Sequence, residues 1–136
     1  MMLVVIDTNI ILSALGWGGT PGKVIDLCLG GKCKMVVSQP ILQEIEDVLN
    51  RPSFGFIASN LKKELLITLS EMAEIINPST KISASRDPKD DKFIEAAIAA
   101  GAKYIVSGDK DLLTLKSYGT VMIITAAEFV KLFESM

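Results

Sequence analysis

Four short aliphatic runs recur along the chain, and none of them alternates with polar residues. They are Leu3–Ile6, Met35–Val37, Tyr104–Val106 and Val121–Ile124. Runs of this kind, rich in β-branched residues, are typical of strands that are covered on both faces of a parallel sheet. Segments with helical periodicity lie between them. The chain is therefore predicted to be an α/β protein with a central parallel sheet.

Capping residues delimit the predicted helices. Thr20 with Pro21 opens the first helix and Ser38 with Pro40 opens the second, because a hydroxyl can accept from a first-turn amide and proline tolerates the first helical position. The polar stretch 77–89 is expected to be a mobile loop. The expected helices span about 21–29, 39–50, 61–76, 90–100 and 126–133.

Length and composition indicate one ordered domain spanning residues 1–136, because 49% of the residues are hydrophobic and the mean hydropathy is +0.40. The longest apolar runs are far shorter than the roughly 20 residues that a bilayer span needs. The N-terminus enters an apolar run directly, without a basic leader. We therefore expect a cytoplasmic protein that does not bind membranes.

The chain contains no histidine, which excludes serine–histidine and cysteine–histidine relays and zinc deaminases. Its two cysteines, Cys28 and Cys33, are too few for a cysteine zinc site and are expected to be buried thiols. Sixteen acidic and 14 basic residues give a net charge of −2. A protein of this charge needs a bound positive group if it is to hold a polyanion such as nucleic acid.

Polar residues follow three of the aliphatic runs. Asp7 comes after the first run, Ser38 after the second, and Ser107-Gly108-Asp109 after the third. Because the carboxyl ends of parallel strands meet at one edge of the sheet, we expect Asp7 and Asp109 to lie at the same edge.

Two helices that start at this edge can add carboxylates to it. Asp90 falls near the middle of the inward face of its helix and Asp91 at the margin, and an acid on a buried face is costly unless it is paired, capping or bound to a cation. In the helix after Ser38, Glu44 and Glu46 flank the apolar arc about equally. Glu44 is nearer the start of the helix and therefore nearer Asp7.

Four converging carboxylates without histidine or thiolate would repel one another unless a cation neutralised them. All-oxygen ligation suits Mg²⁺ or Mn²⁺, which bind through a few carboxylates and a substrate phosphate. The favoured chemistry is metal-assisted hydrolysis of a phosphodiester bond, for which no protein nucleophile is required.

Four motifs in this order carry a family resemblance across the whole chain. The motifs are Asp7-Thr8-Asn9, Ser-x-x-Ile-Leu-x-Glu-Ile from Ser38, Asp87-Pro88-x-Asp90 leading to Phe93-Ile94-x-x-Ala97, and Ser107-Gly108-Asp109-Lys110-Asp111-Leu112-Leu113. Together they resemble a PIN-domain ribonuclease. The chain looks most like the small prokaryotic PIN proteins of the VapC kind, which are classed as toxin components of toxin–antitoxin pairs.

The resemblance implies a three-layer α/β/α sandwich around a parallel sheet and endonuclease action on RNA. It also implies a four-acid Mg²⁺ or Mn²⁺ site, a homodimer and a cognate antitoxin. The acids carried over are Asp7, Glu44, Asp90 and Asp109. The residues that match supporting positions are Thr8, Asn9, Ser38, Ser107 and, as a further acid, Asp111. Ser107 stands where many relatives have threonine, which keeps the hydroxyl.

Each of these residues also has a purely structural interpretation. Asp7 could form an Asx-turn, and Ser38 could serve as a helix N-cap. Asp87 could cap the helix that begins at Pro88, with Asp90 as its capping-box partner. Glu44 could be a solvated helix charge. Asp109 and Asp111 could cap the short turn that follows them.

Two alternative functions remain open. The chain could be a receiver-like domain phosphorylated at a strand-end aspartate, although no such aspartate stands in mid-chain. It could also be a PIN-like module that binds RNA or a partner without catalysis.

The glycine-rich segment 16–23 fails the P-loop and dinucleotide patterns, so it is predicted to be a flexible turn, with Trp17 packing at an interface. The long third helix is expected to expose apolar surface to a second copy. The cleft rim offers basic residues that would grip phosphates in a salt-dependent way, namely Arg86, Lys89, Lys92 and Lys110.

Overall fold

The computed structural model describes residues 1–135, and its core is a six-stranded sheet. The four aliphatic runs form β1 (Leu3–Ile6), β2 (Lys34–Val37), β4 (Tyr104–Val106) and β6 (Val121–Ile124). Two short edge strands, β3 (Glu74–Ile75) and β5 (Ser117–Tyr118), complete the order β3-β2-β1-β4-β6-β5. Every neighbouring pair is parallel except β5–β6. The predicted α/β class with a central parallel sheet is confirmed.

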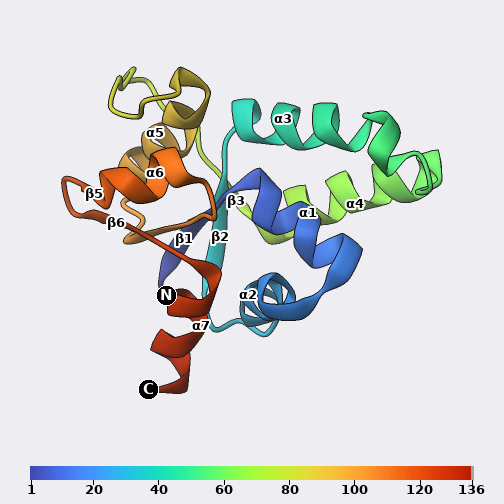
Figure 1. Cartoon of the computed structure of the whole chain (residues 1–136), viewed down its shortest axis with the longest axis horizontal. Coiled ribbons are helices and arrows are strands. Elements are labelled where there is room, and N and C mark those ends of the chain that lie inside the picture. The colour runs from blue at the N-terminus through green and yellow to red at the C-terminus, as the bar shows by residue number, and fades with distance from the viewer. Residues whose placement is uncertain (136) are drawn as a thin grey trace.

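Helices cover both faces of this sheet (Figure 1). Helix α5 packs across β1, β2, β4 and β6 on one face, whereas α2 packs against α1 and α7 on the other. Two 3₁₀ turns, Pro52–Phe54 and Pro88–Asp90, precede α4 and α5. The helices are α1 (Thr8–Trp17), α2 (Gly19–Leu29), α3 (Gln39–Leu49), α4 (Ser59–Met72), α5 (Asp91–Ala100), α6 (Lys110–Leu115) and α7 (Ala126–Glu134).

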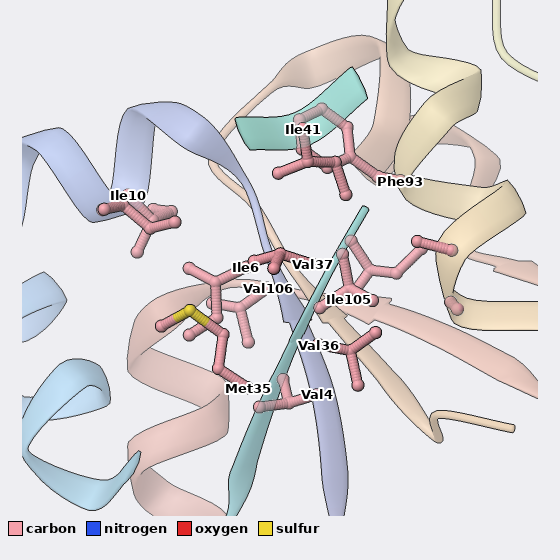
Figure 2. Packing of buried hydrophobic residues seen from close by; sticks show 14 of the residues in the cluster. Val4, Ile6, Ile10, Met35, Val36, Val37, Ile41, Phe93, Ile105 and Val106 are labelled. Atoms are coloured by element: carbon pink, nitrogen blue, oxygen red, sulfur yellow. The ribbon is translucent and has the colours of Figure 1, made fainter. Parts of the chain in front are cut away.

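Side chains of the central strands alternate between the two layers of helices. Figure 2 shows Ile6 and Met35 on the side of α1 and α2, and Val36 and Ile105 on the side of Phe93 in α5. All five of these side chains are almost completely buried. Burial on both faces explains why the strands are continuous aliphatic runs rather than alternating ones.

The glycine-rich segment differs from the predicted flexible turn. Helix α1 runs to Trp17, and α2 begins at Gly19, two residues before the expected start at Pro21. Gly18 joins the two helices with φ of 69°, a backbone conformation that favours glycine. Gly18 is also the N-cap of α2, so the prediction that Thr20 is the N-cap was wrong. Trp17 is 78% exposed and therefore does not pack into the core of this chain.

The third predicted helix ends four residues earlier than expected. Helix α4 stops at Met72, and Ala73 adopts an extended backbone. The chain then forms β3 beside β2, and the amide of Ile76 donates to the carbonyl of Val37 at 2.8 Å. Helical periodicity could not show this end, because the unpaired edge of β2 offers the same residues a competing set of backbone hydrogen bonds.

The loop 77–89 is fastened to α5 by two carboxylates. The amides of Ala84 and Ser85 donate to Asp91 at 3.2 and 2.8 Å, and the amide of Ile82 donates to Glu95 at 2.9 Å. Asp91 is only 6% exposed. These bonds place the segment that carries Asp87 against the start of α5, so its expected mobility is restrained at three points.

Cys33 is buried and Cys28 is half-buried, with their sulfur atoms 3.3 Å apart and both thiols free. Within residues 1–135, the longest apolar helices fall short of what a membrane crossing requires.

Asp91→Ala should destabilise the protein by about 2–4 kcal/mol, because two loop amides would lose their buried acceptor. The free energy of unfolding, measured by urea denaturation, tests this. Asp26→Ala, on the exposed side of α2, is the matched control and should change stability by no more than about 0.5 kcal/mol. Equal effects of the two substitutions would show that Asp91 does not anchor the loop.

Candidate metal and nucleic-acid site

The register of β1 and β4 creates the candidate site. Ile6 pairs with Val106 in parallel, and the amide of Asp7 donates to the carbonyl of Val106 at 2.9 Å. Asp7 is the first residue after β1, and Ser107 is the first after β4. Strands β1 and β4 thus end side by side at one edge of the sheet.

A short chain of hydrogen bonds links Asp7 to the loop after β4. The Ser107 hydroxyl donates to Asp7 Oδ2 at 2.6 Å, and the same hydroxyl oxygen accepts from the amide of Asp109 at 2.9 Å. The amide of Asn9 donates to Asp7 Oδ1 at 3.2 Å, so the turn-forming interpretation of Asp7 is confirmed as well. Burial raises the pKa of Asp7, and these hydrogen bonds oppose that rise.

Asp109 caps helix α6. Its Oδ1 accepts from the amides of Asp111 and Leu112 at 2.8 and 3.3 Å, which confirms the capping interpretation for Asp109. Both bonds use the same oxygen. The cap therefore holds the carboxylate in one orientation beside Asp7, whose pKa is raised in part by the negative charge of Asp109.

Asp90 lies at the end of the 3₁₀ turn before α5. Its Oδ2 is buried and has no hydrogen-bond partner among the described residues, and its side chain makes no capping bond to α5. The turn Pro88–Asp90 is capped by Asp87 through the amide of Lys89, without a bond from Asp90 among the described residues, so the predicted capping-box partnership of Asp90 with Asp87 is wrong. Burial raises the pKa of Asp90 to about 7, and the negative charges of Asp109, Asp7 and Asp87 add to the rise.

Glu44 enters the site from the second turn of α3, whose start is capped by the buried Ser38 hydroxyl at 3.4 Å from the amide of Ile41. Its carboxylate pairs with the ammonium group of Lys92, which also donates to the carbonyl of Lys89. Glu44 is half-buried whereas Glu46 is exposed. Glu44 thus forms a half-buried ion pair with Lys92 and is not a freely solvated helix charge.

A second group of acids overlaps the first at Asp90. Oxygen atoms of Asp87, Asp90 and Asp111 all lie within 4.8 Å of one another, and Asp111 lies 4.0 Å from the guanidinium of Arg86. Asp87 also caps its turn by accepting from the amide of Lys89 at 3.0 Å. Sequence reasoning treated Asp87 only as a cap. The three-residue spacing of Asp87 and Asp90 was the available signal, because it puts both carboxylates on one side of a turn.

The structure thus brings all four predicted acids to one region without merging them into a single tight group. The charges of Glu44 and Asp109 act on Asp7, and those of Asp109 and Asp7 act on Asp90. Of the predicted supporting residues, Thr8 is buried with a hydroxyl that has no partner among residues 1–135, and Asn9 contributes its backbone amide. Lys92, expected at the rim, is held by Glu44.

These residues fit a hard divalent cation. The donors are carboxylate oxygens, which Mg²⁺ and Mn²⁺ prefer, and several of them are crowded at a partly buried edge. A cation would satisfy the buried oxygen of Asp90 and remove the repulsion that raises the pKa of this residue. The same charge would let a net-acidic protein hold a phosphate.

Comparison with known proteins shows the family to which the sequence is similar. The family model described as PIN domain matches residues 3–111. A curated relative, Uncharacterized protein MJ1680 of Methanocaldococcus jannaschii, is 36% identical over 142 residues, which cover 96% of this chain and 91% of the relative.

Two solved structures share the fold. VapBC2 from Rickettsia felis, solved bound to a DNA fragment from its promoter, matches with a TM-score of 0.61 and 16% identity, covering 90% of this chain and 97% of that one. VapBC-1 from nontypeable Haemophilus influenzae matches with a TM-score of 0.62 and 14% identity, covering 93% and 99%.

Asp90→Asn should stabilise the metal-free protein at high pH. The pKa of Asp90 rises from 3.8 to about 7 on folding, so the folded state holds this proton more tightly, and stability is lost as pH rises from about 4 to 7. Asparagine removes that loss. With excess EDTA, we expect a gain on the order of 1 kcal/mol at pH 8, allowing for solvent screening, or about 3 °C in Tm.

The same pair should differ little at pH 3.5, where Asp90 is protonated in the folded state and mostly protonated in the unfolded state. Thermal melts of the wild type, Asp90→Asn and the exposed Asp26→Asn control across pH 3.5–8 provide the measurement. A melting difference that does not change with pH would contradict the raised pKa.

Proposed function

The chain belongs to the PIN domain family, and on that premise we propose that it is a Mg²⁺- or Mn²⁺-dependent endoribonuclease. The proposed reaction is hydrolysis of RNA phosphodiester bonds, carried out by one domain spanning residues 1–136. The observation that carries the proposal is the buried oxygen of Asp90, which has no hydrogen-bond partner in the described part of the chain and lies near the charges of Asp7 and Asp109. Nuclease action of this metal-dependent kind needs neither histidine nor a protein nucleophile.

Asp7, Glu44, Asp90 and Asp109 are the residues that we propose to hold the cation. When bound, the cation supplies a positive charge that stabilises the charge developing on the phosphate and lowers the pKa of a water molecule. The chain's own residues hold the carboxylates in place. Ser107 orients Asp7, the α6 amides orient Asp109, and Lys92 restrains Glu44. Thr8, Asn9, Ser38 and Asp111 are assigned supporting roles.

We also propose a cognate antitoxin and a cytoplasmic location, as for a VapC-like toxin. The similar folds come from two VapBC structures, and one of those was solved with promoter DNA. Family membership favours this function over a receiver-like phosphoacceptor. A PIN module that only binds RNA or a partner is the outcome to which a failed cleavage experiment would lead.

Cleavage of a pool of structured RNAs tests the nuclease function directly. We expect cleavage with Mg²⁺ or Mn²⁺ and none with excess EDTA. Asp7→Asn and Asp90→Asn should each lower the rate by at least about 100-fold, because each removes a charged ligand. Asp26→Asn, far from this edge on α2, should cleave at the wild-type rate and excludes a contaminating nuclease.

Equal cleavage by all three variants would contradict the assignment of the site. If nothing is cleaved, melting with and without divalent cation separates the remaining cases. A cation that raises the Tm of the wild type but not of Asp90→Asn would retain the metal site without the nuclease. A cation that changes neither Tm would favour the binding module.

We propose further that α4 mediates a homodimer. Leu61 and Ile67 on this helix are 53% and 57% exposed, so α4 leaves large aliphatic side chains uncovered that a second copy would bury. Ile67→Glu would place a charge in the contact. Light scattering after gel filtration should give about twice the 14.7 kDa chain mass for the wild type and the single mass for Ile67→Glu. Lys23→Glu, at an exposed position on α2, is the charge control and should remain dimeric.

A further inference from the structure

A cavity of about 500 Å³ opens directly beside the acids, between the first two turns of α1 and the loop from β4 to α6. Asp109 forms part of its wall, so the cavity adjoins the proposed metal site. Its volume lies in the range of small-ligand sites, about 300–1,000 Å³. None of the roles assigned above uses this space.

The walls of the cavity combine a polar side with an apolar floor. Asn9 and Ser13 are one helical turn apart on α1, so they lie on the same face of that helix and line the cavity together. Ile10, which is 8% exposed, and Gly108 supply an apolar surface. A Cβ atom at Gly108 would lie 3.9 Å from Ile10 Cδ1, an ordinary van der Waals contact, so this wall of the cavity is formed by backbone and an aliphatic side chain.

We propose that this cavity binds the base of the nucleotide next to the phosphodiester bond that is cut. The inference rests on the proposed nuclease function for the position of the scissile phosphate. Asp109 and Asp111 both line the cavity, and Lys110 is the one basic residue among the lining residues. Two carboxylates repel a phosphate group but accept hydrogen bonds from a neutral base. The apolar surface of Ile10 and Gly108 suits the face of a base, because bases pack against apolar side chains.

The polar groups also specify which bases fit. The carboxylate of Asp111 and the side-chain amide oxygen of Asn9 can accept hydrogen bonds from exocyclic amino groups, as acidic side chains do with cytosine and asparagine does with adenine. Adenine, cytosine and guanine carry such an amino group, whereas uracil does not. The cavity should therefore prefer an amino-bearing base over uracil.

Nuclear magnetic resonance of the ¹⁵N-labelled full chain in EDTA tests the cavity independently of catalysis. The probes are adenosine, cytidine and uridine 5′-monophosphates and, as the control for the shared charge, inorganic phosphate. We expect the amides of Ser13, Gly108 and Lys110 to shift with the adenine and cytosine nucleotides. Uridine monophosphate should bind at least about threefold more weakly, and phosphate alone should leave these amides unshifted.

Two tryptophan substitutions on α1 provide the matched variants. Ser13→Trp fills the cavity, whereas Leu15→Trp changes a 45% exposed residue on a different side of the helix. Ser13→Trp should abolish the nucleotide shifts and lower RNA cleavage at least tenfold, and Leu15→Trp should do neither. If Ser13→Trp does not fold, Asn9→Ala should reduce the preference for the adenine nucleotide over uridine monophosphate to less than half.

The outcomes separate this inference from the nuclease function. Wild-type RNA cleavage without nucleotide shifts at the cavity would overturn the base site and leave the nuclease standing. Nucleotide shifts without RNA cleavage would support the base site and contradict the nuclease function. Equal shifts with inorganic phosphate or with uridine monophosphate would also overturn the proposal, because the cavity would then not read an amino-bearing base.

Discussion

The hydrogen bond from Ser107 to Asp7 joins two residues that lie 100 positions apart, and the functional edge of the sheet depends on it. It exists because β1 and β4 are parallel neighbours that end at the same level. The same hydroxyl accepts the amide of Asp109, so one serine sets the relation between two carboxylates. Without the hydroxyl, the buried carboxylate of Asp7 would keep, among the described residues, only the hydrogen bond from the amide of Asn9, at a cost in stability.

Several acidic side chains lie close together around this bond, and only some of them are paired with a basic side chain. Lys92 offsets Glu44 and Arg86 approaches Asp111, whereas the buried oxygen of Asp90 has no counterpart among residues 1–135. The positive side chains do not fully offset the negative charge, because acidic residues outnumber basic ones at this edge. That deficit is what makes a divalent cation chemically suitable, and it connects the acidic composition of the chain to phosphate binding.

The central strands and most helices could be predicted from the sequence, because continuous β-branched runs and three-four periodicity are local signals. The location of Asp7 and Asp109 at one edge followed from the parallel topology. The prediction that Asp90 is more deeply buried than Asp91 was wrong, because Asp90 ends the 3₁₀ turn before α5 and is half-buried, whereas Asp91 is only 6% exposed. Asp91 illustrates where local reasoning ends. Its burial is compensated by amides from a loop six and seven residues upstream, which periodicity cannot reveal. Lys92 likewise pairs with Glu44 of α3, a contact between separate helices that local sequence patterns do not reveal.

The place of β1 in the middle of the sheet has a consequence for synthesis of the protein. The strand leaves the ribosome first, yet one of its two neighbours, β4, follows only after about three-quarters of the chain. Until then one edge of β1 has no partner, and the loop that carries Ser107 and Asp109 has not been made. An incomplete nascent chain is therefore both open to aggregation along that edge and without its full set of acids. For the nuclease proposed above, the order of strands delays completion of the site until β4 and the loop that follows it have been made.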